Sequence, residues 1–392
     1  MPKPPTNSKN RAGKKSAAQS GCAFRIAGSH HFGQSRRTSG HEQERRFLRA
    51  PSFFIALVSL LFIAATAQAE PPNAKTLVED AKQNFQPIVV PSPGNDSVTA
   101  ARIELGRRLF FENRVSMDGN VSCAHCHLPD KQASDGLPKA IGVFGKENPR
   151  NAPSIFNAAL NFKQHWRGDR ESLEDQAEKS LLGPASFGNP DQATAMSKLK
   201  AIPAYAGAFA KAFRGDQDPI NSKNWGVAVG AFERTLLTPS KFDAFLTGDA
   251  SALTKQEAAG LRKFIDLGCV ACHNGPGLGG NSFQKFGVAT DYWKETGVAN
   301  PDKGRADVTK NDADLYLFKV ASLRNVARTA PYFHDGSVDN LTAAVKIMGK
   351  TQLGQDLSEK DAADIVDFLG ALTGPVPANY SPPDPYPDAE TK

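Results

Sequence analysis

The feature that most constrains this chain is a five-residue pattern that occurs twice, at 123–127 and 269–273. In each copy, two cysteines separated by two residues are followed directly by a histidine. Such a pattern is typical of c-type haem attachment: the thiols form thioethers to the porphyrin, and the histidine binds the iron. A redox cysteine pair or a zinc site would not require histidine directly after each pair. The chain is therefore predicted to bind two haems covalently, through Cys123, Cys126, Cys269 and Cys272, with His127 and His273 as proximal iron ligands.

The first 69 residues have the character of a secretory leader. A polar, basic stretch precedes an apolar run at 53–65, and Ala67-Gln68-Ala69 follows as a small-residue cleavage pattern. The alternative is a membrane anchor, but the run is shorter than the roughly 20 residues that span a bilayer. The sequence therefore predicts a leader removed after Ala69, export to the periplasm and no stable membrane insertion.

Removing this leader changes the charge of the protein. The leader carries 11 basic and 2 acidic residues, so the formal net charge falls from +6 to −3. A mildly acidic chain does not suit nucleic acid, but it suits a basic redox partner. Only Cys22 remains outside the two haem motifs, so no disulfide framework is expected.

The mature chain has helical periodicity and no convincing alternating strand. Long loops rich in Gly, Pro and Asn follow each motif, at 129–153 and 274–312. We therefore predict a mainly α fold with two cytochrome c-type haem domains related as a pseudo-repeat. Helices are expected over 101–113 and 224–237, and from Thr254 and Ser358 onward. The expected segments are 1–69 (leader), 70–247 (first haem domain), 248–376 (second haem domain) and 377–392 (Pro-rich tail).

The stretch Val320–Gly336, which ends in Tyr-Phe-His-Asp-Gly, closely resembles a signature of the bacterial dihaem cytochrome c peroxidases and their relative MauG. The resemblance includes 149–157, the Trp166 segment and 242–246, and it extends over nearly the whole mature chain. It implies reduction of hydrogen peroxide to water at the first haem. The electrons would come from a small c-type cytochrome or cupredoxin and would enter at the second haem. Members of this family are often homodimers.

The resemblance also implies roles for single residues. In the family, a methionine fourteen residues after the histidine of Tyr-Phe-His-Asp-Gly binds the second iron, and that position is Met348; MauG has tyrosine there. His334 would lie beside a haem edge, and Trp166 would couple the two haems. A calcium ion between the haems would be held by Asn151 and by the backbone carbonyls of Thr329 and Pro331, which are oxygen ligands of a kind suited to Ca²⁺.

Three positions near the first haem depart from the family pattern. Val143 stands where many members have a distal histidine ligand, and Ser186 stands where they have a proton-transferring glutamate. Ser180 replaces a proline, whereas the family glutamine is retained as Gln176. The site is therefore predicted to be open to peroxide without prior reduction.

His165 occupies a position where the family usually has phenylalanine, over the distal face of the first haem. An imidazole could move the proton of peroxide, so the hypothesis is that His165 replaces the missing glutamate as base. Ligation of the iron by His165, or a surface position, are the alternatives. His125, inside the first motif, is expected to face solvent.

Two other functions compete with the peroxidase interpretation. A MauG-like oxidase would use peroxide to modify Trp or Tyr in a partner protein; the altered distal pocket favours it and Met348 opposes it. A simple electron-transfer cytochrome would require both irons to be six-coordinate.

Overall fold

The computed structural model describes residues 74–90 and 97–388. The predicted leader and its cleavage site lie outside these residues. The described residues all belong to one compact unit. Within the described ranges, no helix is both long and apolar enough to cross a membrane.

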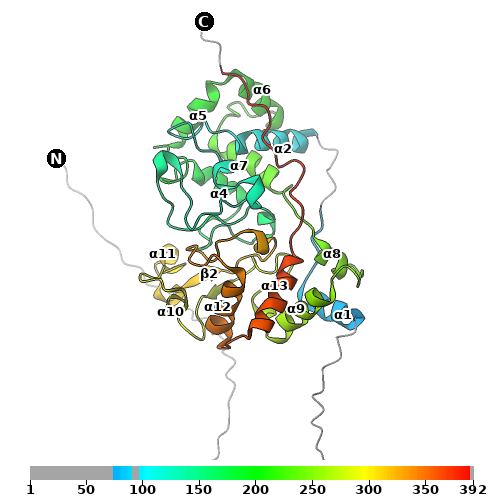
Figure 1. Ribbon diagram of the computed structural model, residues 1–392. Coiled ribbons are helices and arrows are strands. Elements are labelled where there is room, and N and C mark those ends of the chain that lie inside the picture. The colour runs from blue at the N-terminus through cyan, green and yellow to red at the C-terminus, as the bar shows by residue number, and fades with distance from the viewer. Residues whose placement is uncertain (1–73, 91–96, 389–392) are drawn as a thin grey trace, which may run out of the picture. The chain divides into compact units, whose positions relative to one another are not determined.

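This part of the chain is mainly helical, as predicted, with little sheet (Figure 1). The α-helices are α1 (Ala74–Asn84), α2 (Ser97–Phe110), α3 (Cys123–Cys126), α4 (Leu173–Ser180), α5 (Gln192–Lys200), α6 (Pro203–Ala212), α7 (Ser222–Glu233), α8 (Lys241–Leu246), α9 (Lys255–Asp266), α10 (Tyr292–Thr296), α11 (Ala306–Thr309), α12 (Leu341–Leu353) and α13 (Glu359–Gly370). The strands are β1 (Phe283–Lys285) and β2 (Leu317–Lys319).

The two helices that the sequence predicts from Thr254 and Ser358 begin at those side-chain caps. Thr254 accepts a hydrogen bond from the Glu257 backbone and the Glu257 side chain caps Thr254 in return, which starts α9. Ser358 accepts from the Asp361 backbone at the start of α13. Each cap satisfies amide groups that the first helical turn leaves without partners.

The two strands were not predicted. Phe283 pairs with Lys319 and Lys285 with Leu317 in an antiparallel register. Each strand has only three residues, too few for alternation of polar and apolar residues to be visible in the sequence.

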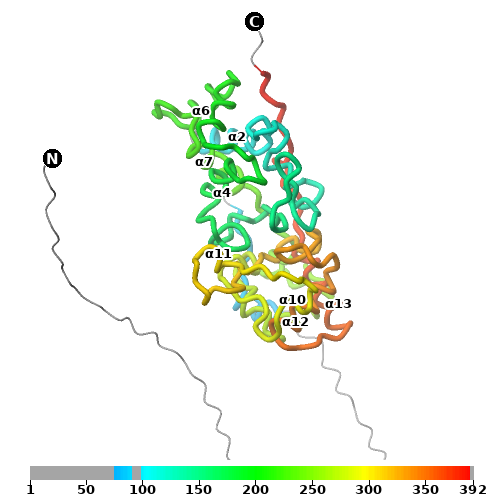
Figure 2. The backbone as a smooth tube through the Cα atoms, turned by 90° about the vertical axis from the view of Figure 1, so that its left-hand side faces the viewer, coloured from blue at the N-terminus to red at the C-terminus, as the bar shows by residue number. Residues whose placement is uncertain are grey.

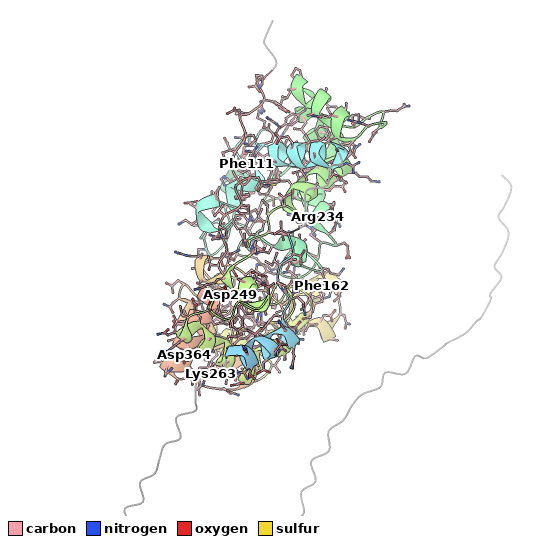
Figure 3. The ribbon with its side chains drawn as sticks, turned by 90° about the vertical axis from the view of Figure 1, so that its right-hand side faces the viewer. Phe111, Phe162, Arg234, Asp249, Lys263 and Asp364 are labelled. Atoms are coloured by element: carbon pink, nitrogen blue, oxygen red, sulfur yellow. The ribbon has the colours of Figure 1, made fainter. Side chains whose placement is uncertain are left out.

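Two separate apolar cores are built around two helix crossings. In the first, α2 packs on α7; in the second, α9 packs on α13, where Lys263 and Asp364 are labelled in Figure 3. Both crossings use a glycine: a Cβ on Gly106 would lie 1.8 Å from the Ala228 carbonyl oxygen, and one on Gly260 would lie 1.8 Å from that of Asp364. The backbones approach so closely that only glycine fits at either position.

The ends of the described chain pack on the core that is distant in sequence. Helix α1 contacts α8 and α9 of the second core. The segment after α13 runs back along the first half, where it is drawn in red beside α2 (Figure 2). Tyr380 of this segment is 3% exposed and belongs to the first core. The Pro-rich segment is therefore part of the packed structure as far as residue 388.

Candidate functional site

The first motif is a single helical turn followed by a half-buried histidine. The ring Nδ1 of His127 lies 3.0 Å from the carbonyl oxygen of Ala133, and burial lowers the pKa of His127 to about 4. The ring is therefore neutral, and a proton on Nδ1 directed to the carbonyl leaves Nε2 as a free lone pair. Metal-binding histidines are commonly oriented in this way.

The second motif repeats this arrangement. The ring Nδ1 of His273 lies 3.1 Å from the carbonyl oxygen of Leu278, and burial again lowers the histidine pKa. Both carbonyl-bearing residues have left-handed backbone: φ is 56° at Ala133 and 47° at Leu278. Residues with a Cβ rarely adopt this conformation. Its occurrence at both acceptors indicates that the strained backbone serves to position the carbonyl that orients each imidazole.

The cysteines favour haem attachment over redox exchange. Burial raises the pKa of Cys126 to about 12 and that of Cys269 to about 11. A redox-active cysteine needs a lowered pKa, because the thiolate is the nucleophile. Unpaired, protonated thiols directly before an oriented neutral histidine fit the requirements of a c-type haem at both motifs.

Trp166 lies where the two halves of the compact unit meet. Its indole Nε1 donates to the Asn151 carbonyl (3.0 Å), and its own carbonyl accepts from the Lys319 amide (2.7 Å). Its ring centroid is 6.4 Å from that of His334. The amide of Asn151 donates to the His334 carbonyl (2.9 Å). Trp166, Asn151 and His334 are therefore brought together, although nothing in their spacing along the chain requires it.

His334 lies inside an aromatic box and is 2% exposed. Its ring stacks on Phe318 with centroids 4.2 Å apart, and Nε2 lies 3.5 Å from the Tyr292 hydroxyl. Burial lowers its pKa, although the charges of Asp335 and Asp302 oppose this. Met348, on α12, packs against the same aromatic cluster.

The predicted calcium ligands are amide and carbonyl oxygens from two loops. Asn151 is 7% exposed and its side-chain amide donates to the Leu137 carbonyl (2.8 Å). Thr329 and Pro331 flank Ala330, and the Ala330–Pro331 peptide bond is cis. In the residues that the structure covers, no group of three or more His, Cys, Asp or Glu side chains could hold a metal ion.

The two distal positions that depart from the expected pattern are joined to each other. The Val143 amide donates to the Ser186 carbonyl (3.2 Å), and Val143 is fully buried. A Cβ on Gly188 would lie 2.7 Å from Val143, so the two loops pack tightly here. Gln176 is partly buried on α4.

His165 lies on a sharp turn, with φ at 64° and its side chain 40% exposed. Its charge contributes to lowering the pKa of His127, after burial, so its ring lies within electrostatic range of the first motif. Its Nδ1 is 3.4 Å from Asp169 Oδ1. His125 is exposed, as predicted, and its Nε2 lies 3.0 Å from the Ile141 carbonyl.

Comparison with known proteins identifies the family. A family profile described as di-haem cytochrome c peroxidase matches residues 100–251. The cytochrome c551 peroxidase of Pseudomonas aeruginosa is 40% identical over 329 residues, which cover 83% of this chain and 94% of that protein. The chain belongs to the di-haem cytochrome c peroxidase family.

Other members of the family include both of its branches. The cytochrome c peroxidase Ccp of Escherichia coli is 39% identical over 73% of this chain and 61% of its own. The methylamine utilization protein MauG of Methylorubrum extorquens is 33% identical over 79% of this chain and 87% of its own. Among solved structures, a MauG-like protein associated with microbial copper homeostasis has a TM-score of 0.65 and 29% identity, with 76% of this chain and 96% of that chain covered.

Two site features of this di-haem peroxidase family member were not predicted. Asp169 faces His165, and its side chain is 11% exposed. The Tyr380 hydroxyl donates to the backbone carbonyl of His127, from the segment that was expected to be only a tail. The acidic residue four positions after His165 was visible in the sequence; the long-range contact of Tyr380 had no local signal.

Proposed function

We propose that this protein reduces hydrogen peroxide to water with electrons from a c-type cytochrome. One peroxide molecule, two electrons and two protons give two molecules of water, so each turnover consumes two one-electron donors. The observation that carries this proposal is the pair of half-buried, neutral histidines, each directed by a backbone carbonyl and each preceded by a cysteine pair, in a chain of this family. Two c-type haems held there supply the one-electron and oxygen chemistry.

Two haem domains related as a pseudo-repeat are part of this proposal. The matched glycine crossings of α2 with α7 and of α9 with α13 support it. Asn157 and Asn325 support it too: both have left-handed backbone, and each side-chain amide donates to the hydroxyl of Thr238, at 2.7 and 2.8 Å. The 70–247 and 248–376 segments remain our proposed division, with α1 and the C-terminal segment each packed on the opposite core.

In this proposal the second motif receives electrons. Met348 would complete the coordination begun by His273, its thioether raising the haem potential. His334, enclosed by aromatic rings, would contact the haem edge. Trp166 would carry electrons to the first site. Its hydrogen bonds to the Asn151 carbonyl and from the Lys319 amide hold it between the first and second halves of the compact unit.

In the first site, His165 would take the proton from peroxide and return it to the departing oxygen, with Gln176 lining the pocket. General acid–base catalysis of this kind typically contributes ~10²–10⁴-fold in rate. Val143 cannot bind iron, so the first site would react without prior reduction. A calcium ion bound by Asn151, Thr329 and Pro331 would stabilise the junction between the halves.

A MauG-like oxidase that modifies Trp or Tyr of a partner protein is the second candidate. The MauG relatives and the serine and valine at the two distal positions favour it. Met348 opposes it, because MauG has tyrosine there. The predicted leader supports a periplasmic location. The expected homodimer is tested by measuring the mass of the holoprotein in solution.

The deciding experiment is peroxide turnover by the holoprotein with reduced cytochrome c, with and without pre-reduction. Fast turnover without pre-reduction is the expected result. Consumption of peroxide with negligible oxidation of cytochrome c would instead support the oxidase. No reaction in either state would contradict both and leave an electron carrier.

A further inference from the structure

The turn that carries His165 also contains a buried carboxylate. The Asp169 side chain is 11% exposed, and its Oδ2 accepts from Arg170 Nη1 at 2.7 Å and lies 3.5 Å from Arg167 Nη2. Its other oxygen, Oδ1, is fully buried and accepts no hydrogen bond of good geometry in the described structure. Nδ1 of His165 lies 3.4 Å from Oδ1.

Asp169 is ionised at neutral pH. Burial alone would raise the pKa of this carboxyl, but the nearby His165 imidazole and the charges of Arg167 and Arg170 together lower it well below its usual range. A buried anion is costly unless it is paired, so the imidazole and the two guanidinium groups are its compensation.

The turn is held rigid by contacts with the other half of the unit. Its ends join through the hydrogen bond from the Gln164 amide to the Arg170 carbonyl (2.9 Å). Phe283 lies over Gly168, where a Cβ would be 2.3 Å from the ring, and Arg305 donates to the Arg167 carbonyl (3.1 Å). His165 and Asp169 therefore keep their mutual geometry, despite the cost of ~1–2 kcal/mol for left-handed backbone at His165.

We propose that Asp169 is a positioning residue for His165: its carboxylate accepts a hydrogen bond from Nδ1–H, which fixes the tautomer and leaves Nε2 to exchange the proton of peroxide. This inference rests on the proposed role of His165 as base. A carboxylate at Nδ1 is a general way to orient an imidazole that takes a proton at Nε2 and to stabilise the resulting imidazolium. The turn thus supplies a two-residue proton-transfer unit where the family glutamate is replaced by Ser186.

A double-mutant cycle on the holoprotein tests this inference. The second-order rate constant for reaction with hydrogen peroxide would be measured by stopped-flow absorbance for wild type, His165→Ala, Asp169→Asn and the double variant. We expect His165→Ala to lower the rate ~10²–10⁴-fold and Asp169→Asn to lower it at least ~10-fold. Because Asp169 acts through His165, the double variant should match His165→Ala alone. Asp218→Asn, which removes an exposed carboxylate paired with Lys200, is the matched charge control and should leave the rate unchanged.

The pH profile supplies a readout that a purely structural role would not move. The base must be neutral to act, so the rate should fall on the acid side. Asp169 lies beside the imidazole and is itself paired with Arg167 and Arg170. His127 of the first motif is within electrostatic range of the imidazole, and Arg305 approaches the turn at the Arg167 carbonyl. Asp169→Asn removes the only anion among them, so the acid limb should shift to lower pH while the haem spectrum stays unchanged.

The experiment distinguishes failure of the proposed role of His165 from failure of the proposed role of Asp169. If His165→Ala reacts with peroxide at the wild-type rate, or changes the iron from low to high spin, His165 is not the base, and the positioning role falls with it. If His165→Ala is slow but Asp169→Asn is as fast as wild type, or slows both backgrounds equally, only the role of Asp169 is overturned.

Discussion

Two turns of this protein, at 164–170 and 332–338, have nearly the same backbone and different chemistry. Each is closed by a bridge between its end residues, and each has left-handed backbone at its second and fifth positions: His165 (64°) and Gly168 (61°), Phe333 (69°) and Gly336 (62°). The first turn places a histidine at its second position with the side chain 40% exposed. The second turn has its histidine at the third position, 2% exposed. One backbone design therefore supports an imidazole that solvent reaches and one that aromatic rings enclose.

The difference extends into the two cores. Beside the matched residues Asn157 and Asn325, the first core has Phe156 and the second has Arg324, which makes a two-pronged pair with Asp243 at 2.7 and 2.9 Å. The first core places a carboxyl, Glu233, near its haem motif. The two cores are therefore built alike but contain different charged and titratable groups.

Exchanging the second residues of the two turns should give the largest effect. His165→Phe should lower the rate of reaction with peroxide ~10²–10⁴-fold, because it removes the proposed base. The reciprocal Phe333→His should leave that rate near wild type, since both positions have the same left-handed backbone and Phe333 packs on Phe286, outside the proposed proton-transfer pair. Stopped-flow measurement on both holoproteins checks this; equal losses in the two variants would contradict the functional difference between the turns.

Breaking the Arg324–Asp243 pair should strongly affect stability. The side chains are 0% and 9% exposed, so Arg324→Leu leaves a buried carboxylate without its cation and should cost ~3–5 kcal/mol. Arg262→Leu, which removes a partly exposed pair with Asp80, should cost ~1 kcal/mol or less. Denaturant unfolding of the holoproteins measures both. Similar losses in the two variants would show that burial does not distinguish the pairs.

Glu233 should make the stability of the protein pH-dependent. Burial, with a contribution from the charge of Glu174, raises its pKa to about 8. The unfolded chain releases this proton near pH 4.5, whereas the folded protein retains it to about pH 8, so stability should fall as pH rises across this window. Glu233→Gln cannot ionise and should lose less stability between pH 5 and 8, as followed by denaturant midpoints. An unchanged slope would assign the pH dependence to other groups.

Removing the Tyr380 hydroxyl should give the smallest of these effects. Tyr380→Phe keeps the aromatic packing on Phe156 and Phe232 but leaves the His127 carbonyl without its donor, at a cost of ~1–3 kcal/mol. The first haem's spectrum should change more than the second's. A change at the second haem alone would contradict the assignment of this contact to the first site.

The parts of the structure that the sequence predicted are those encoded locally. Each haem motif places its two cysteines and its proximal histidine within five residues, and α9 and α13 begin at side chains that cap amides three positions away. The exposed position of His125 inside the first motif is local in the same sense.

The parts that could not be predicted depend on residues far apart in the chain. The pairing of β1 with β2 joins two three-residue segments across a long loop. The hydrogen bond from Tyr380 to His127 links residues 253 positions apart. His165 and Asp169 are four positions apart, which the sequence shows. Their side chains meet only because the backbone at His165 is left-handed. Spacing alone does not specify such a backbone.

The docking of Tyr380 on the backbone of His127 has a consequence for how the protein is made. The chain is synthesised from its N-terminus, so the residues of the first motif are made long before the segment that packs against them. The first core includes Tyr380 and is complete only when this last segment has been made, whereas the second core includes no residue beyond Leu372. Biogenesis of the first site therefore ends with the C-terminus, and a chain stopped just after α13 would contain both haem motifs but only one finished core.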